Sequence, residues 1–248
     1  MNKQSYRSGF QKDVLGYEQI TQSKYIKIIY SLEKEVIAKF LKGIKSDKLS
    51  AMDFACGSGR WTTYLEGYFD SITGVDVSGK MIELAKGKCK KAKFCVKDIT
   101  KESQKPTNRY DVITAFRFYK NAEDDLRKDA TKRLEDYLDS GGYFIFDLHL
   151  NTFSFMGVAA NLMKILRINK VIKINDYALR TISLMDIKHL FRNSSFEIVD
   201  YYGMGFLPSR SNHLILPEKM LYRFERFLMR NKWLRPFSYN LLVIARKR

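Results

Sequence analysis

The chain has 248 residues, of which 45% are hydrophobic and 14% aromatic, and its formal net charge is +17. This apolar content is enough for a packed core and excludes a wholly disordered chain. Three cysteines (Cys56, Cys89 and Cys95) without CxxC spacing argue against a disulfide framework and a metal site, so we expect no metal and a reducing, cytoplasmic environment.

The positive charge is unevenly spread along the chain. Residues 51–150 carry 17 basic and 16 acidic side chains, whereas residues 151–248 carry 17 and 6. No secretory signal and no stretch long enough to cross a bilayer is visible, so any membrane contact is expected to be peripheral. The excess charge predicts an anionic partner that docks on the last hundred residues.

Strands and helices are predicted to alternate through the first 150 residues. The expected elements are a helix over 24–43, a strand over 49–55, a helix near 61–68, a strand over 71–77, a helix over 80–88, strands over 93–96 and 110–116, a helix over 122–138 and a strand over 142–148. This alternation is typical of βαβ units in a doubly wound parallel sheet, which binds ligands at the carboxyl ends of its strands.

The rhythm changes after Leu150. An apolar and basic stretch over 153–173 is followed by a helix over 184–193, a strand over 196–202, an insertion over 203–238 and a final strand over 239–245. Without an internal repeat, the whole chain is expected to form one domain.

A glycine turn follows the first predicted strand. It reads Asp53-Phe54-Ala55-Cys56-Gly57-Ser58-Gly59-Arg60, and acidic residues close the next two strands at Asp76 and Asp98. Small residues at 55, 57 and 59 allow a ligand to approach the backbone closely. Thr62 stands where a dinucleotide fingerprint needs glycine, and a carboxylate at position 53 suits an ammonium group better than a pyrophosphate.

This pattern resembles the class I S-adenosylmethionine (SAM)-dependent methyltransferases, whose first motif, acid-x-Gly-x-Gly-x-Gly, appears here with Ala55 for the first glycine. The resemblance implies an α/β, Rossmann-like doubly wound and mostly parallel seven-stranded sheet with an antiparallel last strand, and helical insertions after strand 5 and between strands 6 and 7. Within the single domain it implies an N-terminal helical cap (1–48), a cofactor-binding core (49–150), a lid or insertion (151–183) and C-terminal strands (184–248).

The same resemblance implies SAM as cofactor and S-adenosylhomocysteine (SAH) as product. Asp53 would orient the amino group, Gly57 and Gly59 would pass beneath the methionine, Asp76 would hold the ribose, and Asp98 would bind the adenine amine. The other implied contacts are Ala55, Cys56, Arg60, Val77, Met81, Ile99, Phe116 and, from the first helix, Tyr25. The competing interpretation is an ordinary strand–turn–helix with aspartates as helix caps.

The acceptor side is expected where the fourth and fifth strands end. The sequence after the fourth strand is not Asn/Asp-Pro-Pro-Tyr/Phe, which disfavours the planar-amine acceptors that this motif marks. His149 is the best-placed base for a hydroxyl acceptor, with Tyr119 and His213 as weaker candidates. A structural hydrogen bond is the alternative role for His149.

Two basic amphipathic segments complete the prediction. Residues 153–173 carry Lys164, Arg167, Lys170 and Lys173 among apolar residues, and a helix starting at Pro217 carries Lys219, Arg223, Arg226 and Arg230 beside an apolar set. Together with Arg117, we expect Lys164, Arg167, Arg223, Arg226 and Arg230 to face the substrate or an anionic membrane surface. Packing on the domain, with the cations merely solvated, is the alternative.

The sequence therefore predicts a cytoplasmic, peripherally membrane-associated SAM-dependent methyltransferase. The expected acceptor is an oxygen of a small-molecule or lipid-linked, phosphorylated compound. An RNA methyltransferase and a non-catalytic SAM-binding protein remain alternatives, with a dehydrogenase as the outside option. Nothing in the sequence sets an oligomeric state.

Overall fold

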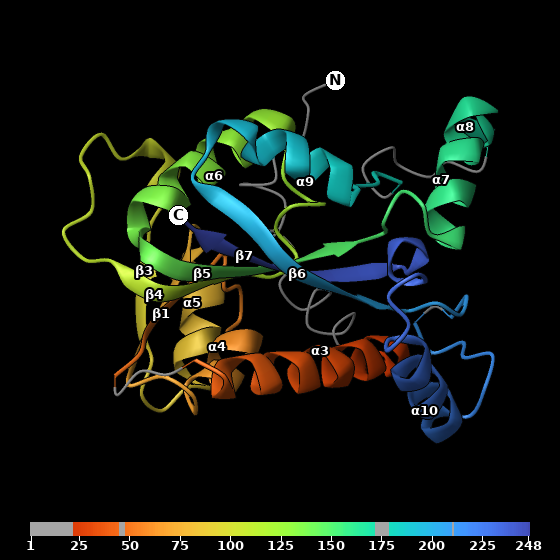
Figure 1. The fold of residues 1–248 in the computed structure, drawn as a ribbon, viewed down its shortest axis with the longest axis horizontal. Helices are drawn as coiled ribbons and strands as arrows, with labels where there is room; N and C mark the ends of the chain where they lie inside the picture. Colours follow the sequence, from red (N-terminus) through yellow and green to blue (C-terminus); the bar gives the residue numbers. More distant parts are fainter. Residues whose placement is uncertain (1–21, 45–47, 172–178, 210) are drawn as a thin grey trace.

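In a computed structural model, which describes residues 22–44, 48–171, 179–209 and 211–248, the described strands form one seven-stranded sheet (Figure 1). The strand order is β3-β2-β1-β4-β5-β7-β6, and β7 runs antiparallel to both β5 and β6 while the other pairs are parallel. This confirms the predicted Rossmann-like α/β class with an antiparallel last strand. The strands are β1 (Ser50–Phe54), β2 (Ser71–Asp76), β3 (Lys93–Val96), β4 (Tyr110–Ala115), β5 (Leu138–His149), β6 (Phe196–Met204) and β7 (Asn240–Lys247).

Helices cover both faces of the sheet (Figure 1). On one face lie α3 (Lys24–Lys42), α4 (Arg60–Leu65) and α5 (Gly79–Lys86), and on the other lie α6 (Asp124–Tyr137) and α9 (Leu184–Leu190). The predicted helix over 184–193 is divided, because its last residues form a 3-10 turn, η2 (Phe191–Asn193). A capping box of Ser183 and Asp186 starts α9.

The core follows the alternation of the strand residues. Ala51, Val112, Ile145 and Leu242 pack with α3 on one face, whereas their strand neighbours Met52, Ile113, Phe144 and Val243 pack in the other cluster with α6 and α9. Strands buried on both faces read as nearly continuous apolar runs, which is why they could be located in the sequence.

The two predicted insertions are helical. After β5 come α7 (Phe155–Ile165) and α8 (Ile168–Val171), and between β6 and β7 come α10 (Glu218–Leu228) and the 3-10 turn η3 (Arg235–Phe237). Among the described residues, no helix is both long enough and apolar enough to cross a bilayer. Lys173 of the first basic segment and the N-terminal residues 1–21 lie outside the described ranges.

Candidate active site

The glycine turn is built from left-handed backbone. Ala55, Gly57 and Gly59 have φ values of 53°, 54° and 78°. A Cβ on Gly59 would lie 2.8 Å from the Ala85 Cβ of α5. Gly59 is thus required both by its φ angle and by close packing of the turn on α5. Its predicted passage beneath a methionine moiety remains a prediction.

Asp76 lies at the end of β2 and faces the turn. Its Oδ2 accepts the N–H of Gly57 at 2.9 Å, and its Oδ1 accepts the N–H of Ser78 at 2.8 Å. Burial raises the pKa of Asp76, against the lowering effect of these backbone hydrogen bonds. An ionised carboxylate has about four acceptor sites. The backbone N–H of Val77 also donates to this carboxylate. Acceptor capacity therefore remains for about one more hydroxyl, and the site fits a ribose hydroxyl of SAM.

Asp53 is buried beneath the turn. Its two oxygens accept hydrogen bonds from the hydroxyls of Thr62 at 2.6 Å and Thr114 at 2.8 Å. Burial raises the pKa of Asp53 to about 6, although both hydroxyls favour the ionised form. The carboxylate thus joins β1, β4 and α4, a supporting role that the sequence did not reveal. Its contact with an amino group stays a prediction.

The remaining predicted adenine contacts lie after β2 and β3. Asp98 caps the 3-10 turn η1 (Ile99–Lys101) by accepting the N–H and hydroxyl of Thr100. Asp98 therefore caps a turn within the protein, as the competing interpretation predicted. Its contact with the adenine amine stays a prediction. Ile99 and Met81 are buried, at 1% and 3% exposure, and Val77 is half-buried.

Aromatic rings line the space between the turn and α3. Phe116 stacks on Trp61 with ring centroids 3.9 Å apart, and the Arg60 guanidinium lies over the Tyr30 ring. The thiol of Cys56 is 3.7 Å from the carbonyl oxygen of Gly57. Phe116, Arg60 and Cys56 stay predicted cofactor contacts.

Three weaker predictions are changed by the structure. Tyr119 is fully buried and its hydroxyl pairs with Thr131 of α6 at 2.9 Å, so it is a core residue and not a catalytic one. His213 is exposed in the loop beside the start of α3 and lacks the buried setting of a base. Tyr25 packs edge-on against Tyr239, and a Cβ on Gly205 would lie 2.4 Å from its hydroxyl, which places this ring beside the end of β6.

His149 and Asp147 share one face of β5 at its carboxyl end, since they are two residues apart on a strand. The His149 Nδ1 lies 3.6 Å from the Asp147 Oδ2, and the His149 side chain is 12% exposed. Burial lowers the pKa of His149 to about 4, helped by the cations Arg117 and Lys120 and opposed by Asp147. The imidazole is therefore neutral at pH 7 and is in the form that can accept a proton.

Arg117 follows β4 and holds Asp147. Its backbone N–H donates to the Asp147 Oδ1 at 2.5 Å and its Nε lies 3.4 Å from Oδ2. Burial disfavours the carboxylate, but Arg117 and His149 outweigh it and lower the pKa of Asp147. Arg117 and Leu150 have φ values of 60° and 58°, so left-handed residues stand after β4 and β5 as well as after β1. Strained backbone of this kind gathers at functional edges.

Glu33 and Asn240 were missed by sequence reasoning. Glu33 of α3 is fully buried and accepts the side-chain N–H of Asn240 at 2.6 Å. Burial raises the pKa of Glu33 to about 7, Arg117 opposes the shift and Asp147 adds to it. A charge within the apolar face of a helix, between Leu32 and Val36, was the signal in the sequence.

This buried cluster has unused hydrogen-bonding capacity. Among the described residues, four of its side-chain atoms have no hydrogen-bond partner: Glu33 Oε2, Asp147 Oδ2, His149 Nδ1 and Asn240 Oδ1. Lys120 is 8% exposed, and burial, with Arg180 and Arg117, lowers its pKa to about 8. Buried polar atoms without a hydrogen bond are costly, so a concentration of them indicates a place for a polar ligand.

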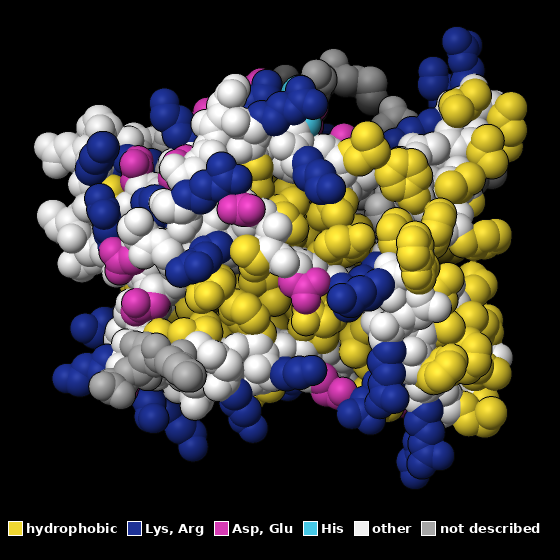
Figure 2. Space-filling view, in the orientation of Figure 1, with side chains coloured by type: hydrophobic (Ala, Val, Ile, Leu, Met, Phe, Trp, Pro, Cys, Tyr) yellow, Lys and Arg dark blue, Asp and Glu magenta, His cyan; other side chains and the backbone are white. Residues whose placement is uncertain are grey.

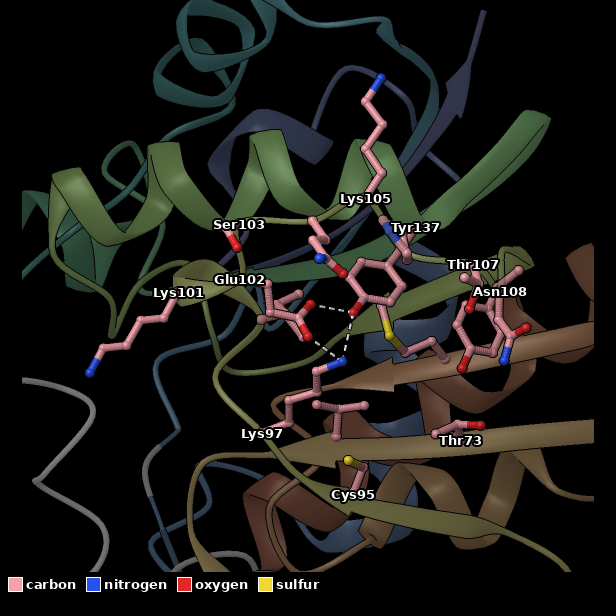
Figure 3. A pocket seen from close by; sticks show the side chains of 16 residues that line it. Thr73, Cys95, Lys97, Lys101, Glu102, Ser103, Lys105, Thr107, Asn108 and Tyr137 are labelled. Atoms are coloured by element: carbon pink, nitrogen blue, oxygen red, sulfur yellow. Dashed lines mark hydrogen bonds and ion pairs between the residues drawn. The ribbon is translucent and has the colours of Figure 1, made fainter.

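A separate cavity of about 520 Å³ lies over β1, β2 and β3 (Figure 3). It exists because η1 and a loop, without an α-helix, connect β3 to β4. Lys97, Glu102 and Tyr137 point toward one another there: Lys97 Nζ donates to the Tyr137 hydroxyl at 3.1 Å, which in turn donates to Glu102. Of the predicted cofactor residues only Ile99 lines it, so it is distinct from the glycine turn.

The known proteins that resemble this chain are methyltransferases. Residues 51–142 match the family model of a methyltransferase domain. The structure is similar to magnesium protoporphyrin IX methyltransferase from Synechocystis PCC 6803 with bound SAH (TM-score 0.65, 15% identity, 98% of this chain and 97% of that chain). It is also similar to a SAM-dependent methyltransferase from Thermotoga maritima, a possible histamine N-methyltransferase (TM-score 0.63, 17% identity, 98% and 100%).

A third similar structure is a plantazolicin methyltransferase in complex with a desmethyl analogue and SAH (TM-score 0.60, 18% identity, 99% and 94%). No curated protein sequence matches the chain. The family match gives a methyltransferase domain over residues 51–142, and the strand order agrees with the fold of the similar SAM-dependent methyltransferases.

Proposed function

We propose that the enzyme methylates an oxygen of an anionic acceptor, either a small molecule or a lipid-linked compound, with His149 as the proton acceptor. The observation that carries this proposal is the buried Asp147–His149 pair at the carboxyl end of β5, with unpaired polar atoms around it. Arg117 and Lys120 supply positive charge at the same place.

The cofactor is assigned to the glycine turn and Asp76 on the same edge of the sheet. When bound, SAM supplies a methyl group activated by a sulfonium sulfur. The turn approaches the ligand through backbone alone, and Asp76 accepts a hydroxyl hydrogen bond while Gly57 and Ser78 orient its carboxylate. A rigid edge of this kind can supply much of the rate by holding two reactants close together.

The proton is assigned to His149. Because Nδ1 faces Asp147, Nε2 is left to take the proton from an acceptor hydroxyl as its oxygen is methylated. The imidazolium that forms is stabilised by the buried Asp147 carboxylate, which in turn is held by Arg117. Shortening the 3.6 Å separation to a hydrogen bond on acceptor binding would make His149 more basic.

The names of the similar structures support the proposal of a small-molecule acceptor. Those names mention magnesium protoporphyrin IX, histamine and a plantazolicin analogue. Proteins of this one fold act on very different acceptors, so the fold alone does not define the acceptor. The site in this chain is buried, polar and cationic, which favours an anionic acceptor.

A methyl-transfer assay tests the proposal. Purified enzyme and radiolabelled SAM are incubated with a host extract that is then separated into lipid, RNA, protein and small-molecule pools. Label in the lipid or small-molecule pool, as a base-labile ester or a stable ether, is the expected result. Label in RNA would establish the RNA alternative instead, and SAM binding without label in any pool would point to a non-catalytic SAM-binding protein.

A further inference from the structure

The helix α7 presents large apolar side chains to solvent. Phe155, Val158, Leu162 and Ile165 are 47–74% exposed and recur on one face, with Leu166 and Ile168 beyond them. The opposite face of α7 is made of small residues: Gly157 and Ala160 are buried, and a Cβ on Gly157 would meet the Asn151 carbonyl oxygen at 2.0 Å. The usual arrangement of an amphipathic surface helix, apolar side inward, is therefore reversed here.

The helix α10 shows the same exposure. Met220, Phe224 and Phe227 are 44–67% exposed and lie on one side of the helix, at a spacing of four and three residues. On its inner side Leu221 and Glu225 are buried, and the Glu225 carboxylate accepts the backbone N–H groups of Gly205, Phe206 and Leu207. Because this clamp fixes the orientation of α10, its apolar side is held outward.

The two exposed faces belong to one edge of the molecule. Asn151, just before α7, donates side-chain hydrogen bonds to the carbonyl oxygens of Pro236 and Ser238, which follow α10. Figure 2 shows hydrophobic side chains gathered along this edge, over α7, α8 and α10. Exposed rings from both insertions add to it: Phe153, Trp233 (88% exposed) and Phe237. We call this surface the apolar edge.

Basic side chains border the apolar edge (Figure 2). They are Lys164, Arg167, Lys170, Lys219, Arg223, Arg230 and Lys232, and none of them has an ion pair with a described residue. On α10 the basic residues lie next to the exposed apolar row, on the side of that row opposite Leu221. Arg226 is the exception: its Nε lies 2.8 Å from Glu35 of α3, so it fastens α10 to the domain and is not a surface contact.

We infer that the apolar edge docks on the surface of an anionic lipid bilayer. Apolar and aromatic side chains would enter the interface while the surrounding lysines and arginines bind lipid headgroups. A second copy of the chain fits less well, because a symmetric pair would bring two sets of like charges together. The described helices are too short or too polar to cross the bilayer, so the contact is peripheral.

Docking in this way places the candidate acceptor site beside the membrane. His149 at the end of β5 is followed within six residues by the start of α7, and Asn240 is preceded within three residues by Phe237 of η3. The inference itself rests on surface geometry and not on methyl transfer, so it can fail while the proposed function holds.

The test is flotation of the full chain with vesicles of phosphatidylcholine alone or mixed with phosphatidylglycerol. The wild type is expected to float with the anionic vesicles and to stay behind with the neutral ones. Replacing Lys219, Arg223 and Arg230 by Gln is expected to weaken binding by on the order of 10–100-fold. A control with the same charge change is Lys93→Gln, Arg109→Gln and Arg192→Gln, all exposed and outside the apolar edge, and it should bind like the wild type.

A second variant separates docking from folding. The double variant Leu162→Ser and Phe227→Ser removes two exposed apolar side chains from the apolar edge and replaces no buried residue. It should therefore lose vesicle binding while its SAM affinity is unchanged. Equal flotation of the wild type and the Gln variant, or no flotation of the wild type, would overturn the inference. Concentration-dependent dimers that disappear in the Ser variant, without vesicle binding, would assign the edge to a second copy instead.

Discussion

The protonation states of the buried ionisable side chains at the carboxyl edge of the sheet depend on the charged groups around them. Asp147 stays ionised because Arg117 and His149 outweigh its burial, whereas Glu33, with one amide partner, has its pKa raised to about 7. His149 is neutral because burial and two cations outweigh one carboxylate. These opposite shifts within one cluster are typical of a catalytic site.

Replacing His149 by Gln tests the proton acceptor. Gln keeps a polar group of similar size but cannot take a proton, so kcat is expected to fall by about 100-fold to 10,000-fold. SAM affinity from calorimetry should remain unchanged. His189→Gln, an exposed histidine on α9, is the matched control and should keep wild-type kcat. An unchanged kcat in His149→Gln would remove the residue from the mechanism.

Replacing Glu33 by Gln tests the buried acid through pH. The folded-state pKa, about 7, is above the ordinary value, so the stability that protonation confers is present below about pH 4.5 and is lost as pH rises through about 7. Between pH 5 and pH 8 the wild type should lose about 2–3 kcal/mol relative to Glu33→Gln. Thermal unfolding of both proteins at the two pH values measures this difference, in which the opposite effect of His149 cancels. Parallel Tm changes would contradict it.

At the scale of elements, the tight contact between the glycine turn and α5 is the most constrained feature. Gly59 has a φ of 78° and its missing Cβ would overlap Ala85. We expect Gly59→Ala to cost about 2–4 kcal/mol through backbone strain and overpacking. Tm should therefore fall by roughly 5–15 °C in a thermal scan. Gly79→Ala, with no atom within 4 Å of the added Cβ, is the control and should leave Tm equal or slightly higher.

The central parallel strands β1 and β4 could be predicted from sequence because both of their faces are buried over most of their length. The bounds of β3 are those predicted, β2 and β4 end one residue earlier than predicted, and β1 is one residue shorter at each end. The start of β5 was missed: the strand was predicted to begin at residue 142, yet Leu138 already pairs with Tyr110 across an irregular register. Pairing with β4 extends the strand beyond what the local sequence indicated.

The candidate site was predictable where the topology fixes it. Residues that follow β1, β2, β4 and β5 meet at one edge in any such sheet, so Asp76 and His149 could be named in advance. The contact between Glu33 and Asn240 could not, because 207 residues separate them and only the packing of α3 brings them together. Tyr119 shows the converse case, since the chain after β4 turns its ring into the core.

For the whole molecule, the charge of +17 separates into regions with different surroundings. The acids at the cofactor edge, the buried Asp53 and the half-buried Asp76, are hydrogen-bonded within the nearly neutral region 51–150. Outside this region, the seven lysines and arginines named above border the apolar edge. Cofactor binding should therefore respond to local substitutions and little to the overall charge.

Binding of SAM should stabilise the whole fold, because the turn and Asp76 have their binding geometry only in the folded chain. At a SAM concentration 100 times Kd the gain is about 2.7 kcal/mol, or roughly 5–10 °C in Tm. Asp76→Ala removes a charged hydrogen bond to SAM, and its loss should raise the Kd for SAM by about 10–100-fold. The Tm shift that SAM causes in this variant should therefore be less than about half of the shift in the wild type. The shift is compared within each protein, since Gly57 and Ser78 also lose a partner in the variant. NAD at the same concentration is the control ligand and should give no shift; a shift with NAD and none with SAM would contradict the cofactor assignment.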